Sequence, residues 1–382
     1  MESGELNEIL AAVREFIRDE VIPREEQIEE TDEIPAGIRR QAAAMGLFGY
    51  ALPEAYGGLG LRMPEDVRLA LELGYTAPAF RSMFGTNNGI AGQVIARFGT
   101  DAQKQAYLPG LAAGELIASF ALTEAEAGSD PSGLRSTGRP DGDGYVLNGQ
   151  KRFITNAPSA DIFVVFARTD PAATGSRGIS AFIVDAKADG VTVGPKDKKM
   201  GQAGAQTSEV ILSDVRVAAD RLVGGVADKA YAWAMTVLAR GRIHIAALCV
   251  GLAQRIQDES VRHAATSKQG GRIIGEHQLV QALLAESQAE IHAGRALVLD
   301  VADRYDAGTD IAMGPSSAKL FCSEMVGRVA DRGVQVHGGL GYMRSVAVER
   351  FYRDARLFRI YEGTSEIQKI VIGRALVKAA RQ

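Results

Sequence analysis

The order of hydrophobic patterns along this chain limits it to a small set of folds. Residues 5–120 and the chain from Lys229 onward carry apolar residues at the three- and four-residue spacing of amphipathic helices. Between them, residues 119–225 form short β-branched segments separated by turn residues, which is typical of antiparallel strands in a barrel or sandwich. A dinucleotide-binding fold of the Rossmann type requires strands and helices to alternate, so this helical–β–helical order excludes it.

We therefore predict an α+β multidomain protein built from three domains. These are an N-terminal α-helical domain over residues 1–118, a middle antiparallel β-barrel or sandwich over 119–226, and a C-terminal four-helix bundle over 227–382. A hairpin turn is expected at 141–144, and Thr100 is expected to cap a helix. The apolar periodicity predicts helices over residues 63–74, 81–98, 101–110, 231–266, 276–306 and 315–336.

The charge balance gives no sign of a nucleic-acid or membrane partner. The formal net charge is −4 and no long basic block occurs, so neither partner is expected. The first residues lack the basic start and apolar run of a signal peptide. We also expect no apolar stretch to approach the length of a membrane-spanning helix. We therefore expect a cytoplasmic protein.

The residue types that bind metals are too few and too scattered to form a metal site. The two cysteines, Cys249 and Cys322, each lie inside an apolar helical pattern, which excludes a disulfide framework and a cysteine-rich metal site. The five histidines show no metal-ligand spacing and are interpreted as structural. The sequence thus predicts no bound metal.

One acidic residue stands out in the segment R-D-A-R-L-F-R-I-Y-E-G-T-S-E-I-Q at residues 353–368. Glu362 lies between an aromatic residue and Gly363, just before a helix start signal. Ser365 with Gln368 three residues later fits a capping box, so a helix is predicted to begin at Ser365. A carboxylate held on such a turn is a candidate general base. The alternative is a solvated acid at a helix N-terminus, where the helix dipole favours negative charge.

Six motifs occur in an order and at a spacing that resemble those of the acyl-CoA dehydrogenase family. The likeness runs over nearly the whole chain, and the six together are far more specific than any one of them. The motifs are P-E-A-Y-G-G-L-G at 53–60, F-A-L-T-E-A-E-A-G-S-D at 120–130, N-G-Q-K-R-F-I-T-N at 148–156, D-V-R-V at 214–217, Q-V-H-G-G-L-G-Y at 335–342 and the segment at 353–368.

This resemblance implies an FAD-dependent enzyme that desaturates an acyl-CoA thioester between its α and β carbons. By the same resemblance, Glu362 abstracts the α-proton, flavin N5 takes the β-hydride, and the Glu362 backbone N–H helps to polarise the thioester carbonyl. Some members carry the base one residue before an arginine on the long helix that follows the β domain. That position is Gly241 here, before Arg242, so no rival base is present. The resemblance also implies a homotetramer (or homodimer) and an electron-transferring flavoprotein as electron acceptor.

The resemblance carries over, position by position, to residues expected to bind the cofactor and the substrate. The expected FAD contacts are Leu122, Thr123, Ser129, Phe153, Ile154, Thr155, Gln335, Val336, His337, Gly338, Gly339, Thr364, Ser365 and Glu366. Gln335 to Gly339 are expected to contact the adenine half of a neighbouring subunit's FAD. The expected substrate contacts are Ser129, Arg242, Gly363, Arg81 and Ser82.

The acyl group is expected to be short or polar. The pair Arg81-Ser82 precedes the helix that would close the acyl end of the pocket, and it resembles the pair in glutaryl-CoA members, whose arginine meets a distal carboxylate. The alternative for Arg81 is a solvated cation at a helix start. Polar residues along the same helix, among them Thr86, Asn87 and Asn88, argue against a deep and wholly apolar channel.

Two departures from the family pattern keep further activities open. Residues 267–272 read S-K-Q-G-G-R where many members have R-x-x-F-G, whose arginine reaches the partner's FAD. Ala239 stands where many members place Asp or Asn to bind the pantetheine arm, so a carrier-protein thioester could replace CoA. The chain could also be a glutaryl-CoA-type dehydrogenase, a flavin oxidase on the same fold or a non-catalytic member without flavin.

Overall fold

The first third of the chain is helical. A computed structural model describes residues 3–381, so residues 1, 2 and 382 of the predicted terminal domains lie outside the described part. Thr100 caps α7 as predicted, because its Oγ1 accepts from Gln103 N (3.2 Å) while Gln103 Oε1 accepts from Thr100 N (3.0 Å). The helices of this part are α1 (Ser3–Phe16), α2 (Glu25–Thr31), α3 (Ala36–Ala44), α4 (Met63–Leu73), α5 (Pro78–Asn88), α6 (Ala91–Phe98) and α7 (Asp101–Ala113).

The helix predicted over residues 81–98 is wrong, because the structure divides it into α5 and α6. The asparagines at the end of α5 bind main-chain groups of other segments instead of continuing the helix. Asn87 Nδ2 donates to Leu116 O (2.8 Å), and Asn88 Nδ2 donates to Leu47 O (2.8 Å). Short polar side chains that bond to the backbone in this way compete with helix hydrogen bonds.

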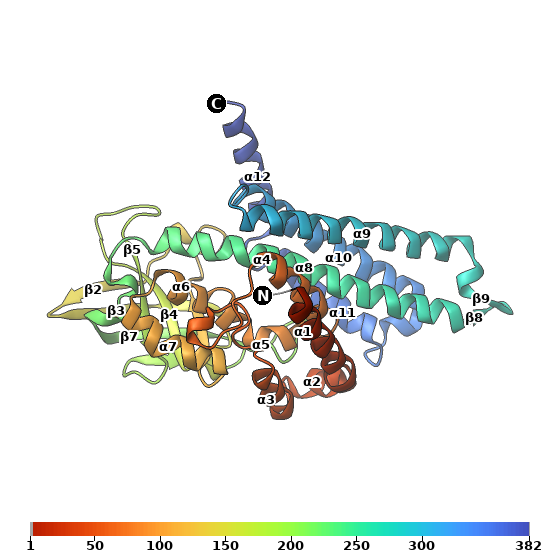
Figure 1. Cartoon of the computed structure of the whole chain (residues 1–382), viewed down its shortest axis with the longest axis horizontal. Coiled ribbons are helices and arrows are strands. Elements are labelled where there is room, and N and C mark those ends of the chain that lie inside the picture. The colour runs from red at the N-terminus through yellow and green to blue at the C-terminus, as the bar shows by residue number, and fades with distance from the viewer. Residues whose placement is uncertain (1–2, 382) are drawn as a thin grey trace.

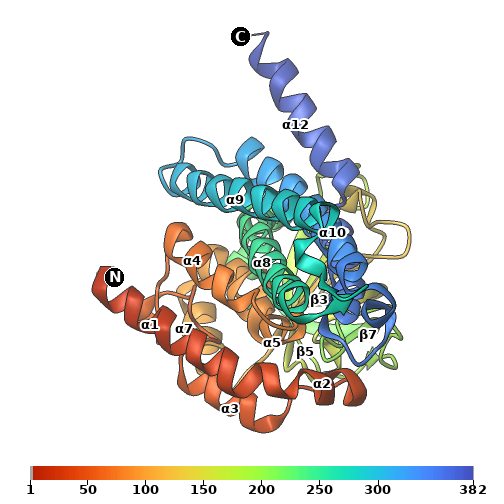
Figure 2. The same ribbon diagram turned by 90° about the vertical axis from the view of Figure 1, so that its right-hand side faces the viewer.

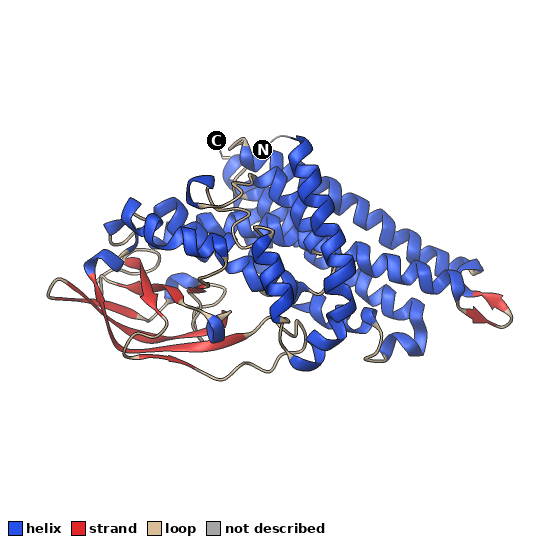
Figure 3. Cartoon of the chain, turned by 60° about the horizontal axis from the view of Figure 1, so that its bottom comes forward, coloured by secondary structure: helices blue, strands red, loops and turns tan. Residues whose placement is uncertain are grey.

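A mixed seven-stranded sheet follows, in the order β1-β4-β2-β3-β7-β6, with β5 also paired to β4 (Figure 3). The turn predicted at 141–144 joins β2 to β3. Most pairs are antiparallel as predicted, but β1 and β2 each run parallel to β4. The β2–β3 hairpin lies between β1 and β4 in the sequence, and this long connection lets the chain return in the same direction. The strands are β1 (Ala118–Ala121), β2 (Thr137–Asp141), β3 (Gly144–Thr155), β4 (Ile162–Arg168), β5 (Ile179–Asp185), β6 (Val191–Val193) and β7 (Thr207–Ala218).

The last part of the chain is helical again and is built around α8. The long helices α8, α9 and α10 lie side by side, while α12 leaves α10 and projects away from them (Figures 1 and 2). The segment predicted to depart from the family pattern forms the β8–β9 hairpin at the far tip of α8 and α9 (Figure 3). The elements are α8 (Ala230–Thr266), β8 (Lys268–Gln269), β9 (Arg272–Ile273), α9 (Gln278–Asp306), α10 (Met313–His337), α11 (Ala347–Ala355) and α12 (Ser365–Ala379).

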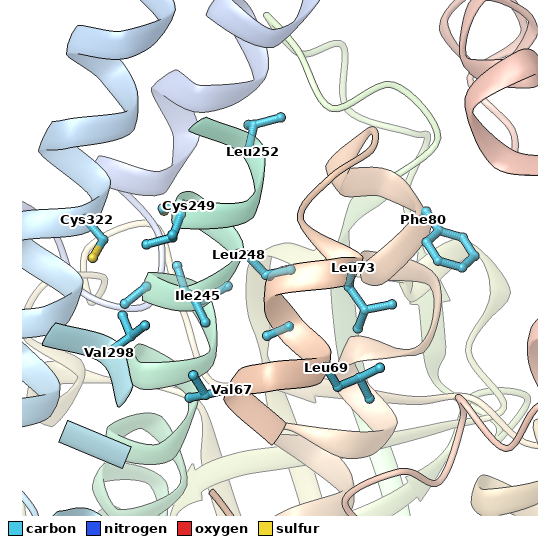
Figure 4. Close-up of a cluster of buried hydrophobic side chains, with 14 of the residues drawn as sticks. Val67, Leu69, Leu73, Phe80, Ile245, Leu248, Cys249, Leu252, Val298 and Cys322 are labelled. Carbon is cyan, nitrogen blue, oxygen red and sulfur yellow. The ribbon is translucent and has the colours of Figure 1, made fainter. Parts of the chain in front are cut away.

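The apolar core joins the two helical parts across α4 and α8. Buried side chains from α4, α8, α9 and α10 meet there (Figure 4). Burial of such side chains contributes about 1.5–3 kcal/mol each. The labelled members of this cluster are Val67, Leu69, Leu73, Phe80, Ile245, Leu248, Cys249, Leu252, Val298 and Cys322.

Helix α8 corrects the expectation that no apolar stretch approaches membrane-spanning length. Among residues 3–381, α8 is the one helix that is long and apolar enough to cross a membrane, by length and composition alone. However, 83% of its apolar 18-residue window is buried inside the protein. The apolar character of α8 is therefore accounted for by its packing in the core.

Two glycines let α4 and α8 approach backbone to backbone. A Cβ on Gly251 would lie 2.3 Å from Leu71 O, and a Cβ on Gly74 would lie 2.4 Å from Leu248 O. These distances leave no room for even a methyl group. The position of α8 against α4 therefore depends on both glycines.

We expect Gly251→Ala to lower the free energy of unfolding by about 1–3 kcal/mol, because the added methyl group forces the two helices apart. Urea denaturation followed by circular dichroism measures the effect. Gly37→Ala on α3 is the matched control, since nothing lies within 4 Å of its Cβ position. Equal stability of the two variants would contradict the close helix crossing.

Candidate active site

A cavity of about 680 Å³ lies where the helical parts meet the sheet. This volume is in the range of small-molecule sites. Segments from all three parts of the chain line the cavity. They are α5, the loops and strand ends around β1 and β3, the segment that leads into β7, α8, the turn before α12 and α12 itself. The predicted site residues that line it are Arg81, Ser82, Leu122, Thr123, Ser129, Phe153, Ile154, Thr155, Arg242, Glu362 and Gly363.

The turn that carries Glu362 has an uncommon backbone conformation. Glu362 and Gly363 both have positive φ values, +54° and +90°. A left-handed conformation is strained for a residue other than glycine and persists only where its surroundings enforce it. Gln368 Nε2 donates to Glu362 O (3.3 Å) and Gly363 O (2.9 Å), and Lys319 Nζ donates to Gly363 O (2.7 Å). These contacts fix the turn from two helices, α12 and α10.

The capping box predicted between Ser365 and Gln368 is wrong, although the helix does begin at Ser365. The cap is Thr364, whose Oγ1 accepts from Ile367 N (3.3 Å). Ser365 Oγ donates instead to Glu324 Oε1 (2.6 Å). Because Thr364 supplies the cap, the Gln368 side chain is free to hold the turn.

The Glu362 side chain points into the protein and does not sit in bulk solvent. Its Oε2 atom is inaccessible to solvent and has no hydrogen-bond partner among residues 3–381. Burial raises the pKa of this carboxyl group, while Arg81, Arg242 and Lys319 oppose the rise. The alternative of a solvated acid at a helix N-terminus is therefore wrong. Glu362 is therefore a desolvated carboxyl group that has no hydrogen-bond partner for Oε2 among the described residues.

Gly241 on α8 makes room for this carboxylate. A Cβ on Gly241 would lie 2.2 Å from Glu362 Oε2. The position from which a rival base would project is thus filled by the Glu362 side chain. The next residue, Arg242, lies close to Gly363 and reaches Ser316 Oγ at 3.5 Å, and burial lowers its pKa. Arg242 is therefore part of the site and not a surface cation.

The predicted flavin contacts of the sheet domain line the same cavity as Glu362. Phe153 has a φ of +57°, and its side chain is 62% exposed. A register shift between Lys151 and Ile154 produces this conformation. A strained, exposed aromatic ring at a cavity fits a planar ligand that covers it.

Other predicted contacts lie outside the cavity. Gln335, Val336, His337, Gly338 and Gly339 are at the end of α10 and in the turn that follows, and none of them lines it. Their predicted role toward a neighbouring subunit's FAD stays a prediction. Thr364, Ser365 and Glu366 form the first turn of α12 beside the cavity without lining it.

Several residues that shape the site were not predicted from the sequence. Lys319 and Gln368 hold the base turn, and His244 with Asp66 stands behind Arg81. One signal was available: Lys319 lies inside the apolar periodicity of a long helix, and lysine is almost never fully buried without a partner. No such signal pointed to His244, because its partners Arg81 and Asp66 lie on α5 and α4 and meet α8 only in the folded protein.

Three family models match nearly the entire chain. They describe the acyl-CoA dehydrogenase N-terminal domain (residues 3–115), middle domain (119–215) and C-terminal domain (231–377). The chain belongs to the acyl-CoA dehydrogenase family. It is therefore an oxidoreductase of this flavoprotein family, with the three-domain fold predicted from its sequence.

Curated relatives of this family member are similar over almost their whole length. A 3-(aryl)acrylate reductase of Clostridium sporogenes is 38% identical over 365 residues, which cover 96% of each chain. The caffeyl-CoA reductase-Etf complex subunit CarC of Acetobacterium woodii is 38% identical, over 92% of this chain and 93% of that protein. The solved structure of butyryl-CoA dehydrogenase from Megasphaera elsdenii has a TM-score of 0.94 at 32% identity and covers 99% of both chains.

FAD is the cofactor of this acyl-CoA dehydrogenase family member. The residues present fit a flavin: Leu122, Thr123 and Thr155 offer backbone and hydroxyl groups at the cavity, beside the exposed ring of Phe153. The Glu362 carboxylate lines the same cavity. A flavin and a base can therefore act on one substrate there.

We expect Gly241→Ala to slow reduction of bound FAD by an acyl-CoA substrate roughly 10²-fold, because the methyl group displaces the Glu362 carboxylate. Anaerobic stopped-flow bleaching of the flavin measures the rate. Gly327→Ala on α10 is the matched control, because the nearest atom to its Cβ position lies at 3.5 Å. A Gly241→Ala enzyme as fast as the control would contradict the packing of the base against α8.

Proposed function

We propose that this protein is an FAD-dependent acyl-CoA dehydrogenase that desaturates a short or polar acyl thioester between its α and β carbons, with Glu362 as base. The observation that carries the proposal is the desolvated carboxylate of Glu362, a residue that lines the same cavity as the expected flavin contacts of the sheet domain. A carboxylate with a raised pKa and no internal partner suits abstraction of a weakly acidic proton.

In the proposed reaction, the Glu362 carboxylate takes the α-proton of the bound thioester. Across residues 3–381 the Glu362 backbone N–H makes no hydrogen bond, so it is available to the thioester carbonyl oxygen. Such a donor stabilises the negative charge that develops on this oxygen. FAD, when bound, supplies the acceptor of the β-hydride at flavin N5. In the reverse direction, which the names of the two reductase relatives describe, the protonated Glu362 returns its proton to the α carbon.

A second candidate substrate class is an acyl chain that ends in a carboxylate, as in glutaryl-CoA. Arg81 favours it, because this residue is 8% exposed and lines the cavity and so is not a solvated cation at a helix start. A guanidinium group can bind a carboxylate through two parallel hydrogen bonds. The polar wall formed by Ser82 and Thr86 beside it also favours a short or polar chain.

We further propose CoA as the carrier, an electron-transferring flavoprotein as electron acceptor and a homotetramer or homodimer as the working assembly. A relative named as a subunit of a reductase-Etf complex supports the acceptor. Exposed apolar side chains support the assembly, since clusters of this kind mark interaction sites. They are Leu340, Tyr342 and Met343 after α10, and Ile370, Leu376 and Val377 on α12.

We expect Glu362→Gln to slow flavin bleaching by roughly 10²–10⁴-fold, since an amide cannot accept the α-proton. The variant should still show the visible spectrum of bound FAD, because the flavin contacts are unchanged. In the wild-type enzyme the rate should rise with pH through a pKa above the ordinary carboxyl value, because only the ionised Glu362 is a base. Bleaching of the variant at the wild-type rate would refute the assignment, and purified protein that binds no flavin would favour a non-catalytic member.

We expect butyryl-CoA or glutaryl-CoA to reduce the flavin at least about tenfold more efficiently than palmitoyl-CoA, because the polar side chains of Arg81, Ser82 and Thr86 line the cavity at α5 and disfavour a long apolar chain. The kcat/KM values for the three thioesters, with an electron-transferring flavoprotein as acceptor, measure the preference. The corresponding carrier-protein thioesters and oxygen consumption are measured in parallel. A preference for palmitoyl-CoA would contradict the proposed substrate class.

A further inference from the structure

The wall of the cavity behind Arg81 contains a buried series of polar side chains that proton abstraction by Glu362 does not itself require. Arg81 Nε on α5 donates to His244 Nε2 on α8 at 2.9 Å, and His244 Nδ1 lies 2.6 Å from Asp66 Oδ1 on α4. Asp66 Oδ2 is paired with Arg240 Nη2 at 2.5 Å. All four residues are buried. Three helices thus contribute to this series, and Arg81 is the member that lines the cavity.

The donors in this series fix the tautomer of His244. A guanidinium group can only donate, so Nε2 is the acceptor and Nδ1 carries the proton that is donated to Asp66. The Tyr50 ring stacks on the imidazole with 5.9 Å between ring centroids, and its hydroxyl lies 3.4 Å from Nδ1. Burial, with Arg81 and Arg240 acting against Asp66, lowers the pKa of His244 to about 4. The imidazole is therefore neutral at neutral pH.

The guanidinium group of Arg81 is oriented by two neighbours. His244 holds its Nε, and Gly85 lies beneath the group, since a Cβ there would be 2.7 Å from Nη1. Among residues 3–381, Nη1 and Nη2 have no hydrogen-bond or ion-pair partner, and both Arg81 and Gly85 line the cavity. Asp66 forms its ion pair with Arg240 and forms none with Arg81.

A neutral acceptor behind Arg81 has a different effect from a carboxylate. A carboxylate in direct contact would orient the guanidinium and also neutralise it, whereas a neutral imidazole orients it and leaves its charge available. A buried cation without a counter-ion is costly, so its charge is expected to meet an anion in the cavity. Glu362 is such a group in this chain, since Arg81 comes first among the charges that lower the pKa of Glu362.

We propose that His244 is a positioning residue for Arg81: held by Asp66 as the Nδ1–H tautomer, it directs both terminal nitrogens of Arg81 toward the acyl group of the substrate and the Glu362 carboxylate. This inference rests on the proposed function and adds to it a residue that touches neither substrate nor flavin. His244 thereby acts on substrate selectivity and on the ionisation of the base through one guanidinium group.

Two conservative variants separate this role from general packing. In His244→Gln the amide oxygen can occupy the place of Nε2 and accept from Arg81. In His244→Asn the shorter amide can still meet Asp66 near the place of Nδ1 but does not reach Arg81. Both variants are polar and of similar size, so they control for each other, and bound FAD and circular dichroism confirm that each is folded. Arg81→Leu gives the full effect of losing the guanidinium.

The first readout is the kcat/KM for glutaryl-CoA relative to butyryl-CoA. His244→Asn should lose at least about tenfold more efficiency with glutaryl-CoA than with butyryl-CoA, as Arg81→Leu should, and His244→Gln should stay within about threefold of wild type. An equal loss with both substrates in both His244 variants would overturn the positioning role and leave a structural one.

The second readout does not depend on a distal carboxylate. The acid limb of flavin reduction by butyryl-CoA should move to higher pH by about half a unit or more in His244→Asn, because a displaced Arg81 no longer favours the ionised Glu362. Arg242, Lys319, Tyr50 and Tyr361 also face Glu362 and are unchanged in the variant. An acid limb that stays in place while wild type and variants are all reduced would overturn only the positioning role. Absence of flavin reduction by every acyl-CoA would overturn the proposed function and this inference with it.

Discussion

The burial of α8 is the constraint on which the rest of the structure depends. This helix of 37 residues packs against α4, α9, α10 and α11, and one stretch of it faces the cavity. Gly251 sets how closely it approaches α4, while Gly241, Arg242 and His244 meet the base, its turn and Arg81. A shift of α8 relative to α4 would therefore also displace the residues that α8 contributes to the cavity, because protein interiors are close-packed and deform little.

The site is also organised by an imbalance of charge. Arg81, Arg242 and Lys319 all lower the pKa of the Glu362 carboxyl group, and across the described residues none of the three forms a direct ion pair with an acid. Burial pushes the pKa of Glu362 up, and the three cations hold it down. The ionisation of the Glu362 carboxyl group is therefore set by opposing effects, with each cation supplied by a different helix. A residue that moves one cation then changes the pKa of this carboxyl group without contacting it.

Much of this could be predicted from the sequence, because local patterns dictate it. The helical–β–helical order, the Thr100 cap and the turn at 141–144 depend on spacing and turn chemistry within a few residues. Of the residues that the six ordered motifs single out, Glu362 and the expected flavin contacts of the sheet domain line one cavity, whereas those at 335–339 do not. The predictions that failed depend on distant contacts: the break between α5 and α6 comes from asparagines that bond to other segments, and β1 is parallel because of where the chain returns. The cap at Thr364 displaced the predicted one because Ser365 bonds to α10.

The contact between Gly241 and the Glu362 carboxylate has a consequence for how enzymes of this family can diverge. In this chain a side chain at position 241 and the Glu362 carboxylate would occupy the same space, so a larger residue on α8 is accommodated only if the carboxylate moves. The residue at one position of α8 therefore limits where an acid can lie on the turn opposite, and a change at either place calls for a matching change at the other.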